Sequence, residues 1–425
     1  MNRPSKKHHF VPQAQLRYFA TRPDQKSVYV YDKQADRSFP SAIRDAGSEN
    51  DFNTVSFEAG KWNFEDLFNG VDGQSARLLA KIIAQRSIGW LLPKERIALS
   101  DLIVTQMLRT SFGRTTPRDL AEQMRQMVRD IGYDPDDDPS MAMPTDSALR
   151  LGAVKNFLER DGHRQSLLRL VPALFEPSEG KRFIISDHPV AVTNAFPYGD
   201  HGLASHGIIV VLPVTPDLAI ALTCTTIISR YEVAVDDQID SIRMARILSY
   251  RDGFRSGTPI VIQPAEVDGY NQRQVSKSAR FIYSATNDFE FARQLLSIHP
   301  ELRDVRTHVT LGEIGRGPPR NPNMPSGLHI VVFGQNDSCM MPISEIDPSG
   351  EGLTAKTSSV DLLALVAEDR QAIRIELFDD GHLRRGMGEA KVVRFGNVAD
   401  GWFRIVHRDQ ALRAFAEHLE SERRV

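Results

Sequence analysis

Cysteine is nearly absent from this chain: two cysteines among 425 residues cannot form a disulfide framework. Such sparing use of cysteine is typical of proteins from a reducing compartment. No stretch approaches the roughly 20 consecutive apolar residues that a membrane-spanning helix needs. The first residues are basic and polar, unlike the apolar core of a secretory signal. These absences together predict a cytoplasmic protein that does not enter a membrane.

The chain also lacks a large excess of charge of either sign. Its formal net charge is -3, although 25% of its residues are charged. A global basic surplus, which marks many nucleic-acid-binding proteins, is therefore missing. A local basic patch is still compatible with this total, because the sum over a chain hides how charge is distributed. Internal repeats and low-complexity tracts are missing as well, which argues against a repeat architecture.

The length of the chain predicts roughly two or three domains. We expect a first domain over residues 1–310, a Gly/Pro-rich linker over 311–327, and a small domain over 328–425. Within the first domain, helical periodicity dominates residues 62–175. Apolar, β-rich runs dominate residues 180–300.

The predicted fold class is α+β. We expect a helical block packed beside a mixed or mostly antiparallel sheet, with the N-terminal strand docked against it. The continuous apolar runs at 208–212 and 218–222 are typical of buried strands. The small C-terminal domain is expected to be α/β, with strands at 329–333 and 402–406 and a final helix over 410–423.

Two adjacent histidines, His8 and His9, open the patterned part of the chain, and Gln13 follows closely. An imidazole can ligate a divalent metal or act as a general base near neutral pH. Because neighbours on an extended chain point in opposite directions, we expect the two rings to have different tasks. Residues 8–13 resemble the opening of the metal-binding motif in nucleases of the His-Asn-His class. The rest of that motif is not matched, so a surface or structural pair of histidines stays an alternative.

A second polar insertion interrupts the β-rich region. Asp187 and His188 stand between two apolar runs, where a core would prefer apolar residues. Such insertions are often site residues at strand ends. We therefore expect both to join the N-terminal histidines in one polar site, with His8 and Asp187 as candidate metal ligands. The alternative is that Asp187 caps a turn and His188 is exposed.

The helical block offers a candidate anion clamp. Pro93 marks the first turn of a helix predicted to run to about Phe112. On this helix, Gln106 and Arg109 lie three residues apart and share a face. The guanidinium of Arg109 could bind a phosphate or carboxylate through two parallel hydrogen bonds, and an interhelical salt bridge is the competing interpretation. The side chains expected to bind substrate are those of Arg109, Gln106, Gln13, Asn194 and Asn271.

Several separated stretches resemble one uncharacterised prokaryotic family, the domain of unknown function 4238. Its members open with a His-His-Tyr/Phe-Val-Pro-Gln motif, continue with Leu-Arg-x-Phe and Gln-x-x-Arg-Thr, and carry Phe-Ile-x-Ser-Asp-x-Pro-Val and Asn-x-x-Gln further on. The matching segments are residues 8–13, 16–19, 106–110, 183–190 and 271–274. The resemblance covers about residues 6–300 and does not explain the segment from about 325 to 425. It implies where a site lies and leaves the chemistry open.

Two functional hypotheses follow. The first is a metal-dependent phosphodiesterase or nuclease, with a divalent metal as its cofactor and a nucleic acid or nucleotide as its partner. In it His9 is the base, His8 and Asp187 hold the metal, and His188 completes the catalytic set. The substrate phosphate binds Arg109.

The second hypothesis is a non-catalytic sensor or interaction module that binds a nucleotide or peptide, with the C-terminal domain contacting a protein partner. The two hypotheses predict different sites. A nuclease needs imidazole and carboxylate groups open to solvent beside a basic surface. A sensor predicts histidines satisfied by buried backbone carbonyls, with no open coordination position.

Overall fold

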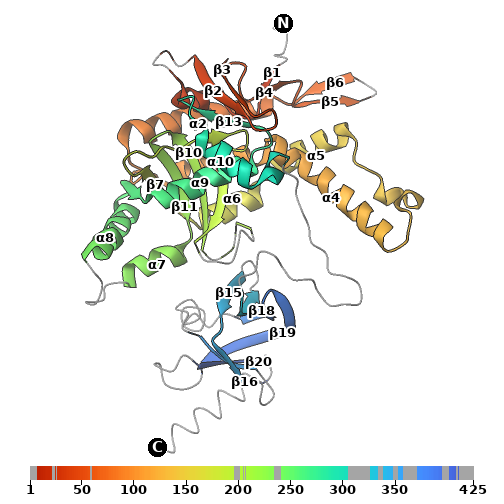
Figure 1. Ribbon diagram of the computed structural model, residues 1–425, viewed down its shortest axis with the longest axis vertical. Helices are drawn as coiled ribbons and strands as arrows, with labels where there is room; N and C mark the ends of the chain where they lie inside the picture. The colour runs from red at the N-terminus through yellow and green to blue at the C-terminus, as the bar shows by residue number, and fades with distance from the viewer. Residues whose placement is uncertain are drawn as a thin grey trace, which may run out of the picture. The chain divides into compact units, whose positions relative to one another are not determined.

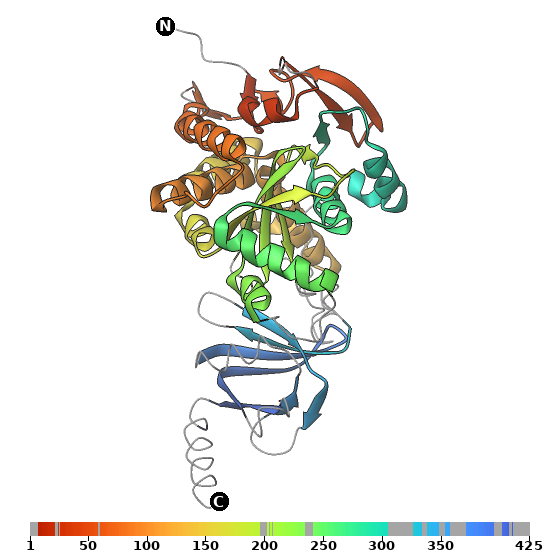
Figure 2. The ribbon, with the colours of Figure 1, turned by 90° about the vertical axis from the view of Figure 1, so that its left-hand side faces the viewer.

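The chain divides into two compact units (Figures 1 and 2). The first comprises residues 1–192 and 209–309, and the second comprises 193–208 and 310–425. The computed structural model describes residues 7–21, 24, 26–57, 60–195, 202–203, 205, 207–233, 241–304, 326–333, 338–347, 353–357, 371–394, 402–407 and 410. The linker predicted at 311–327 lies outside the described residues, apart from its last two positions.

A five-stranded mixed sheet lies at the centre of the first unit (Figure 1). Its strands, in spatial order, are β12 (Pro259–Ile262), β7 (Val171–Pro177), β11 (Leu218–Thr223), β10 (Ile208–Thr215) and β9 (Ala191–Asn194). β7, β11 and β10 pair antiparallel, and β12 pairs with β7 in parallel. Every residue of β11 is buried, as the continuous apolar run predicts for a strand covered on both faces.

A second sheet joins segments from opposite ends of the first unit. Its order is β3 (Arg37–Ala42), β2 (Ser27–Asp32), β13 (Phe281–Ser284) and β8 (Ile185–Ser186), and all its pairs are antiparallel. Ile282 of β13 lies opposite Tyr31 on one side and Ser186 on the other. The N-terminal hairpin is therefore held beside residues that follow it by about 250 positions.

The His-His motif lies on a short strand of its own. β1 (Lys7–His9) pairs antiparallel with β4 (Ser48–Asn50), and His8 lies opposite Glu49. A turn at 51–53 leads from β4 into the hairpin of β5 (Thr54–Phe57) and β6 (Gly60–Asn63). This arrangement places the turn beside the histidines.

The predicted helical block is present and ends somewhat earlier than expected. It contains α2 (Asp66–Gln85), α3 (Pro93–Leu108), α4 (Ser111–Asp130), α5 (Asp146–Leu158) and α6 (Asp161–Leu168). Pro93 opens α3 as predicted, but the helix ends at Leu108 and not near Phe112. The reason is Thr110, whose hydroxyl accepts a hydrogen bond from the Gly113 backbone NH and so begins a new helix. The α3–α4 junction therefore falls at Arg109 and Thr110.

The remaining helices of the first unit surround the sheets. A short α1 (Gln13–Leu16) follows β1, and the others are α7 (Thr225–Val233), α8 (Ser241–Ser256), α9 (Pro264–Lys277) and α10 (Glu290–Ile298). The first unit is thus α+β, as the sequence predicts. Among the residues that the structure describes, no helix has both the length and the apolar character required to span a membrane.

The second unit contains a seven-stranded antiparallel sheet (Figure 2). In spatial order its strands are β15 (Ser338–Pro342), β14 (Leu328–Phe333), β18 (Gln371–Asp379), β19 (His382–Arg394), β20 (Trp402–His407), β17 (Leu353–Lys356) and β16 (Glu345–Asp347). The two ends of this order, β15 and β16, are separated in the chain only by Ile343 and Ser344. The sheet must therefore curl until its edges meet, which encloses a core that includes Ile330, Ile375 and Phe403.

The sequence predicts two of these strands well, since 329–333 and 402–406 correspond to β14 and β20. The final helix predicted over 410–423 lies outside the described residues, apart from Gln410.

The segment between α2 and α3 passes too close to the end of α8 to accept a side chain. A Cβ atom on Gly89 would lie 2.3 Å from the carbonyl oxygen of Ser256. We expect Gly89→Ala to lower the free energy of unfolding by about 1–3 kcal/mol. A Cβ atom on Gly152, inside α5, would have no atom within 4 Å. Gly152→Ala should therefore raise the free energy of unfolding by roughly 0.5–1 kcal/mol. Urea unfolding followed by circular dichroism measures both, and equal shifts in the two variants would contradict this packing.

Candidate functional site

His8 is fully buried and anchors the turn at 51–53. Its Nδ1 accepts a hydrogen bond of 2.9 Å from the backbone NH of Asn53. Its Nε2 lies 3.3 Å from the side-chain amide nitrogen of Asn63. One ring nitrogen of His8 is therefore already occupied by the backbone, and the ring joins β1 to the β5–β6 hairpin.

His9 lies on the opposite side of the strand and is half-buried. Its Nε2 lies 3.2 Å from the backbone carbonyl oxygen of Arg44. Because a carbonyl oxygen only accepts hydrogen bonds, Nε2 must carry the proton, and Nδ1 keeps its lone pair. Burial lowers the pKa of His9, and hydrogen bonding to Arg44 and the nearby Glu65 carboxylate only partly oppose this. His9 is thus a neutral imidazole near pH 7.

Glu65 and Asn53 extend this polar cluster to the start of α2. The Asn53 side-chain amide donates to Glu65 Oε2 over 2.6 Å, and the Glu65 backbone NH donates to Asn63 Oδ1 over 2.8 Å. The backbone NH of His9 lies 3.4 Å from Glu65 Oε1. Asn53 and Asn63 follow His8 by 45 and 55 positions, and the tertiary structure brings both to it.

Arg109 is the most deeply buried cation of the helical block, with 1% of its side chain exposed. Its Nη1 donates to both carboxylate oxygens of Asp72 on α2, at 2.8 and 2.9 Å. The interhelical salt bridge, one of the two interpretations of this residue, is therefore present. It engages only part of the guanidinium. Within the described part of the chain, Nε and Nη2 of Arg109 are buried without a hydrogen-bond partner.

Gln106, one helical turn before Arg109, has the same property. Its side chain is fully buried, and among the described residues neither its amide nitrogen nor its amide oxygen has a partner. Buried polar groups are nearly always hydrogen-bonded, because leaving one unpaired costs about 1–3 kcal/mol. Two such groups on one helix face point to water or a ligand that completes their hydrogen bonds.

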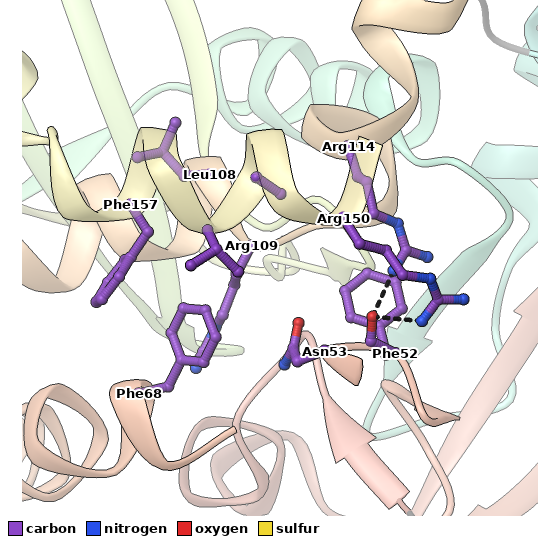
Figure 3. Close-up of a pocket in the computed structure, with 10 residues that line it drawn as sticks. Phe52, Asn53, Phe68, Leu108, Arg109, Arg114, Arg150 and Phe157 are labelled. Atoms are coloured by element: carbon purple, nitrogen blue, oxygen red, sulfur yellow. Dashed lines mark hydrogen bonds between the residues drawn. The ribbon is translucent and has the colours of Figure 1, made fainter. Parts of the chain in front are cut away.

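Arg109 lines a small pocket that we call the arginine pocket (Figure 3). Its polar lining consists of Asn53, Arg109, Arg114 and Arg150, and its apolar lining includes Phe52, Phe68 and Phe157. Figure 3 shows Arg109 near Phe68, the Arg114 and Arg150 side chains converging near Phe52, and Asn53 between the two groups. Elements α3, α4, α5 and the 51–53 turn each contribute to this pocket.

Three arginines make the pocket basic, although the chain as a whole is slightly acidic. The Nη1 atoms of Arg114 and Arg150 both donate to the carbonyl oxygen of Phe52, at 2.7 and 2.8 Å. Burial, and then the neighbouring charge of Arg150, lower the pKa of Arg114 to about 10. No motif in the sequence singles out Arg114 or Arg150. Only folding brings them to Arg109, so no local pattern could have identified them.

Asp187 has a structural task in this fold. Its carboxylate is buried and accepts hydrogen bonds from the backbone NH groups of Ala279, Arg280 and Phe281, at 2.8, 2.7 and 2.7 Å. Burial raises the pKa of Asp187, while these three hydrogen bonds and the nearby Lys33 oppose that change. Neither alternative from the sequence, a metal ligand or a simple turn cap, describes these contacts. The carboxylate clamps β8 to the start of β13, and we call these three hydrogen bonds the Asp187 clasp.

The pairing of His8 with Asp187 around a metal stays a prediction. Both Asp187 oxygens already accept backbone hydrogen bonds, and Nδ1 of His8 does so as well. In the part of the chain that the structure describes, no three His, Cys, Asp or Glu side chains are grouped so that they could hold a metal ion.

The amide side chains of α9 hold the Ser-Asp-His-Pro segment in place. Asn271 accepts from the Ile184 backbone NH over 3.1 Å and donates to the Arg182 carbonyl over 2.8 Å. Gln274 likewise bonds the backbone on both sides of Asp187, through Ser186 and Pro189. Asn271, expected to bind substrate, thus has its amide engaged with the backbone here.

His188 connects this segment to the α3–α4 junction. Its Nδ1 lies 2.8 Å from the Thr110 hydroxyl, and its ring packs against Phe112 with 4.9 Å between the ring centroids. Its side chain is partly buried and not exposed, and this burial lowers its pKa to about 4. The predicted site residues Gln13 and Asn194 lie at the start of α1 and the end of β9, and neither lines the arginine pocket.

Comparison with known families gives one match. The family model described as a protein of unknown function (DUF4238) matches residues 7–288. This range includes every residue of the arginine pocket and of the Asp187 clasp. No curated protein and no solved structure matches the chain.

Replacing the Asp187 carboxylate should destabilise the first unit. In Asp187→Asn an amide NH2 would face backbone NH donors in a buried site, so we expect the free energy of unfolding to fall by about 2–4 kcal/mol. Asp217→Asn makes the same chemical change at an exposed turn and should alter stability by less than about 0.5 kcal/mol. Urea unfolding of both variants measures this. An Asp187→Asn midpoint equal to that of Asp217→Asn would disprove the clasp.

The partly buried His188 should make stability depend on pH. Its folded-state pKa of about 4 lies below the ordinary value of 6.5, so the unfolded chain binds this proton first as the pH falls. Stability should therefore decline between about pH 6.5 and 4, by up to about 3 kcal/mol from this group. His188→Gln should flatten that decline, whereas His163→Gln, at an exposed position, should not. Thermal unfolding across this pH range tests it, and parallel curves for all three proteins would refute it.

Proposed function

This chain belongs to the DUF4238 family of unknown function, and from the geometry of its first unit we propose that it is a binding module for a phosphate-bearing ligand of the nucleotide class. The ligand phosphate binds in the arginine pocket, whose cavity of about 10 Å³ has room for roughly one water, so the lining side chains must move apart to admit it. The observation that carries the proposal is Arg109, which lines that pocket and whose buried Nε and Nη2 have no hydrogen-bond partner among the described residues.

A phosphate suits this guanidinium because of shape and charge. Nε and one terminal nitrogen of an arginine present two parallel NH groups that match two oxygens of a phosphate or carboxylate. In a buried pocket the attraction between such charges is stronger than in water. The bound anion would also supply the acceptors that Arg109 lacks. Asp72 holds the guanidinium through Nη1 and so fixes its orientation toward the pocket.

The histidines support a binding module more than a hydrolase. Nδ1 of His8 is engaged by a backbone NH, and Nε2 of His9 donates to a backbone carbonyl. Both rings thus use one nitrogen to fix the turn and strand around the pocket. The sparing use of cysteine supports a cytoplasmic location, and under this proposal the second unit is the surface for a protein partner.

A metal-dependent phosphodiesterase or nuclease is the second candidate. It is favoured by one feature, the neutral His9 ring, whose Nδ1 keeps a lone pair beside the Glu65 carboxylate. A neutral imidazole near pH 7 suits a general base. With nucleic acid and Mg²⁺ or Mn²⁺, wild type would then release cleaved product and His9→Ala would not. Binding without cleavage in both proteins would decide for the binding module.

Removing the Arg109 guanidinium should abolish most anion binding. We expect Arg109→Gln to weaken the binding of inorganic phosphate and of a nucleoside monophosphate by about 10–100-fold, since a hydrogen bond to a charged group contributes about 1.5–3 kcal/mol. Arg129→Gln removes the same charge at the exposed end of α4 and should leave affinity within about twofold. Titration calorimetry measures both.

The Arg109 variant needs a check on its fold, because the substitution also breaks the pair with Asp72. Arg109→Lys keeps the positive charge and loses the pair of parallel NH donors. It should therefore fold and still bind phosphate several-fold more weakly than wild type. Saturable phosphate binding that is equally strong in folded Arg109→Gln would contradict the proposal.

A further inference from the structure

We propose that the arginine pocket contains two phosphate positions and that its ligand carries a diphosphate. The first position is at Arg109. The second is at Arg114 and Arg150, where the carbonyl oxygen of Phe52 occupies the place of a phosphate oxygen until the ligand displaces it. This inference rests on the proposed function and specifies the ligand of that same pocket.

The second position is defined by two guanidinium groups that converge on one neutral oxygen. Nη1 of Arg114 and Nη1 of Arg150 donate to the Phe52 carbonyl at 2.7 and 2.8 Å (Figure 3). Arg150 Nη1 also donates to the carbonyl of Asp51 and lies 3.4 Å from that of Thr54. Two cations on a group with only a partial negative charge form a weaker arrangement than two cations on an anion.

The carboxylates near these arginines lie on the solvent side. Glu49 is half-exposed and 3.9 Å from Nη2 of Arg114, and the largely exposed Asp146 accepts from Nε of Arg150 over 2.7 Å. The two guanidinium groups themselves are mostly buried. Their outer edges are therefore paired with exposed carboxylates, while Nη1 of each faces the pocket and holds the carbonyl.

Both positions belong to one pocket. Arg109, Arg114 and Arg150 all line it, and Asn53 lies between Arg109 and the other two arginines (Figure 3). A single phosphate at Arg109 satisfies Nε and Nη2 and leaves the Phe52 carbonyl in place. A second phosphate linked to the first is held close to Arg114 and Arg150 at high effective concentration, so it competes well against a neutral carbonyl.

The turn that provides the carbonyl is suited to displacement. Asp51 has a φ of 56°, a left-handed conformation that residues other than glycine adopt at a cost. The arginine contacts to the Asp51 and Phe52 carbonyls stabilise this conformation. When a diphosphate replaces those contacts, the turn relaxes. The hydrogen bond from the Asn53 backbone NH to His8 then weakens, which makes it a reporter of the second position.

The test compares inorganic pyrophosphate with orthophosphate by calorimetry at one pH and at two ionic strengths. We expect wild type to bind pyrophosphate at least about tenfold more tightly than orthophosphate, with the preference persisting at the higher salt because the site is buried. Arg150→Gln should reduce the ratio of the two affinities to near one. Arg109→Gln should weaken both ligands, and Arg129→Gln should keep the wild-type ratio.

Hydrogen exchange gives a second readout that does not depend on affinity. Saturating pyrophosphate should speed exchange of the Asn53 backbone NH, and saturating orthophosphate should not. If Arg150→Gln fails to fold, Arg150→Lys tests the same point, because it keeps the charge and loses the fork. A wild-type affinity ratio near one, with orthophosphate binding still dependent on Arg109, would overturn the second position and leave the proposed function intact. Failure of wild type to bind either anion would overturn both.

Discussion

The first unit depends on one buried carboxylate. Asp187 accepts three backbone hydrogen bonds from residues 279–281, which are 92–94 positions further along the chain. These bonds fix β8 against β13, and β13 in turn pairs with β2 of the N-terminal hairpin. A buried carboxylate is tolerable only because its oxygens are saturated by donors. The same bonds therefore require the three segments to meet in a single arrangement.

Neighbouring side chains make that arrangement unique. The buried Lys33 donates to the carbonyl oxygens of Val275 and Ser278 at the end of α9. Burial lowers the pKa of Lys33 to about 8, and the nearby Asp187 opposes this change. Arg280 pairs with Asp32 through two hydrogen bonds, at 3.1 and 2.7 Å. Asp187, Lys33 and Arg280 at this centre thus each have hydrogen-bond partners that distant segments of the chain supply.

The arginine pocket shows the opposite condition. Both carboxylate oxygens of Asp187 accept hydrogen bonds, whereas the buried Gln106 and Arg109 keep donors without a partner among the described residues. His188 links the two regions, because it follows Asp187 directly and contacts Thr110 beside Arg109. The hydrogen-bonded Asp187 carboxylate thus lies close in the chain to a residue that contacts a region whose hydrogen bonds are incomplete.

The sequence by itself determined the features that depend on local order. Period and capping predict the α+β class and the buried strands β10 and β11, and the helical spacing puts Gln106 and Arg109 on one face. Because side chains alternate between the two faces of a strand, the sequence also predicts that His8 and His9 point in opposite directions. The backbone contacts of Asp187 were decided only by the tertiary structure, because a polar residue between apolar runs has the same pattern whatever partners it meets. The convergence of Arg114 and Arg150 on Phe52 was likewise decided only by the tertiary structure. Their partners come from other elements, and hydrogen bonds between distant segments leave no periodic trace in the chain.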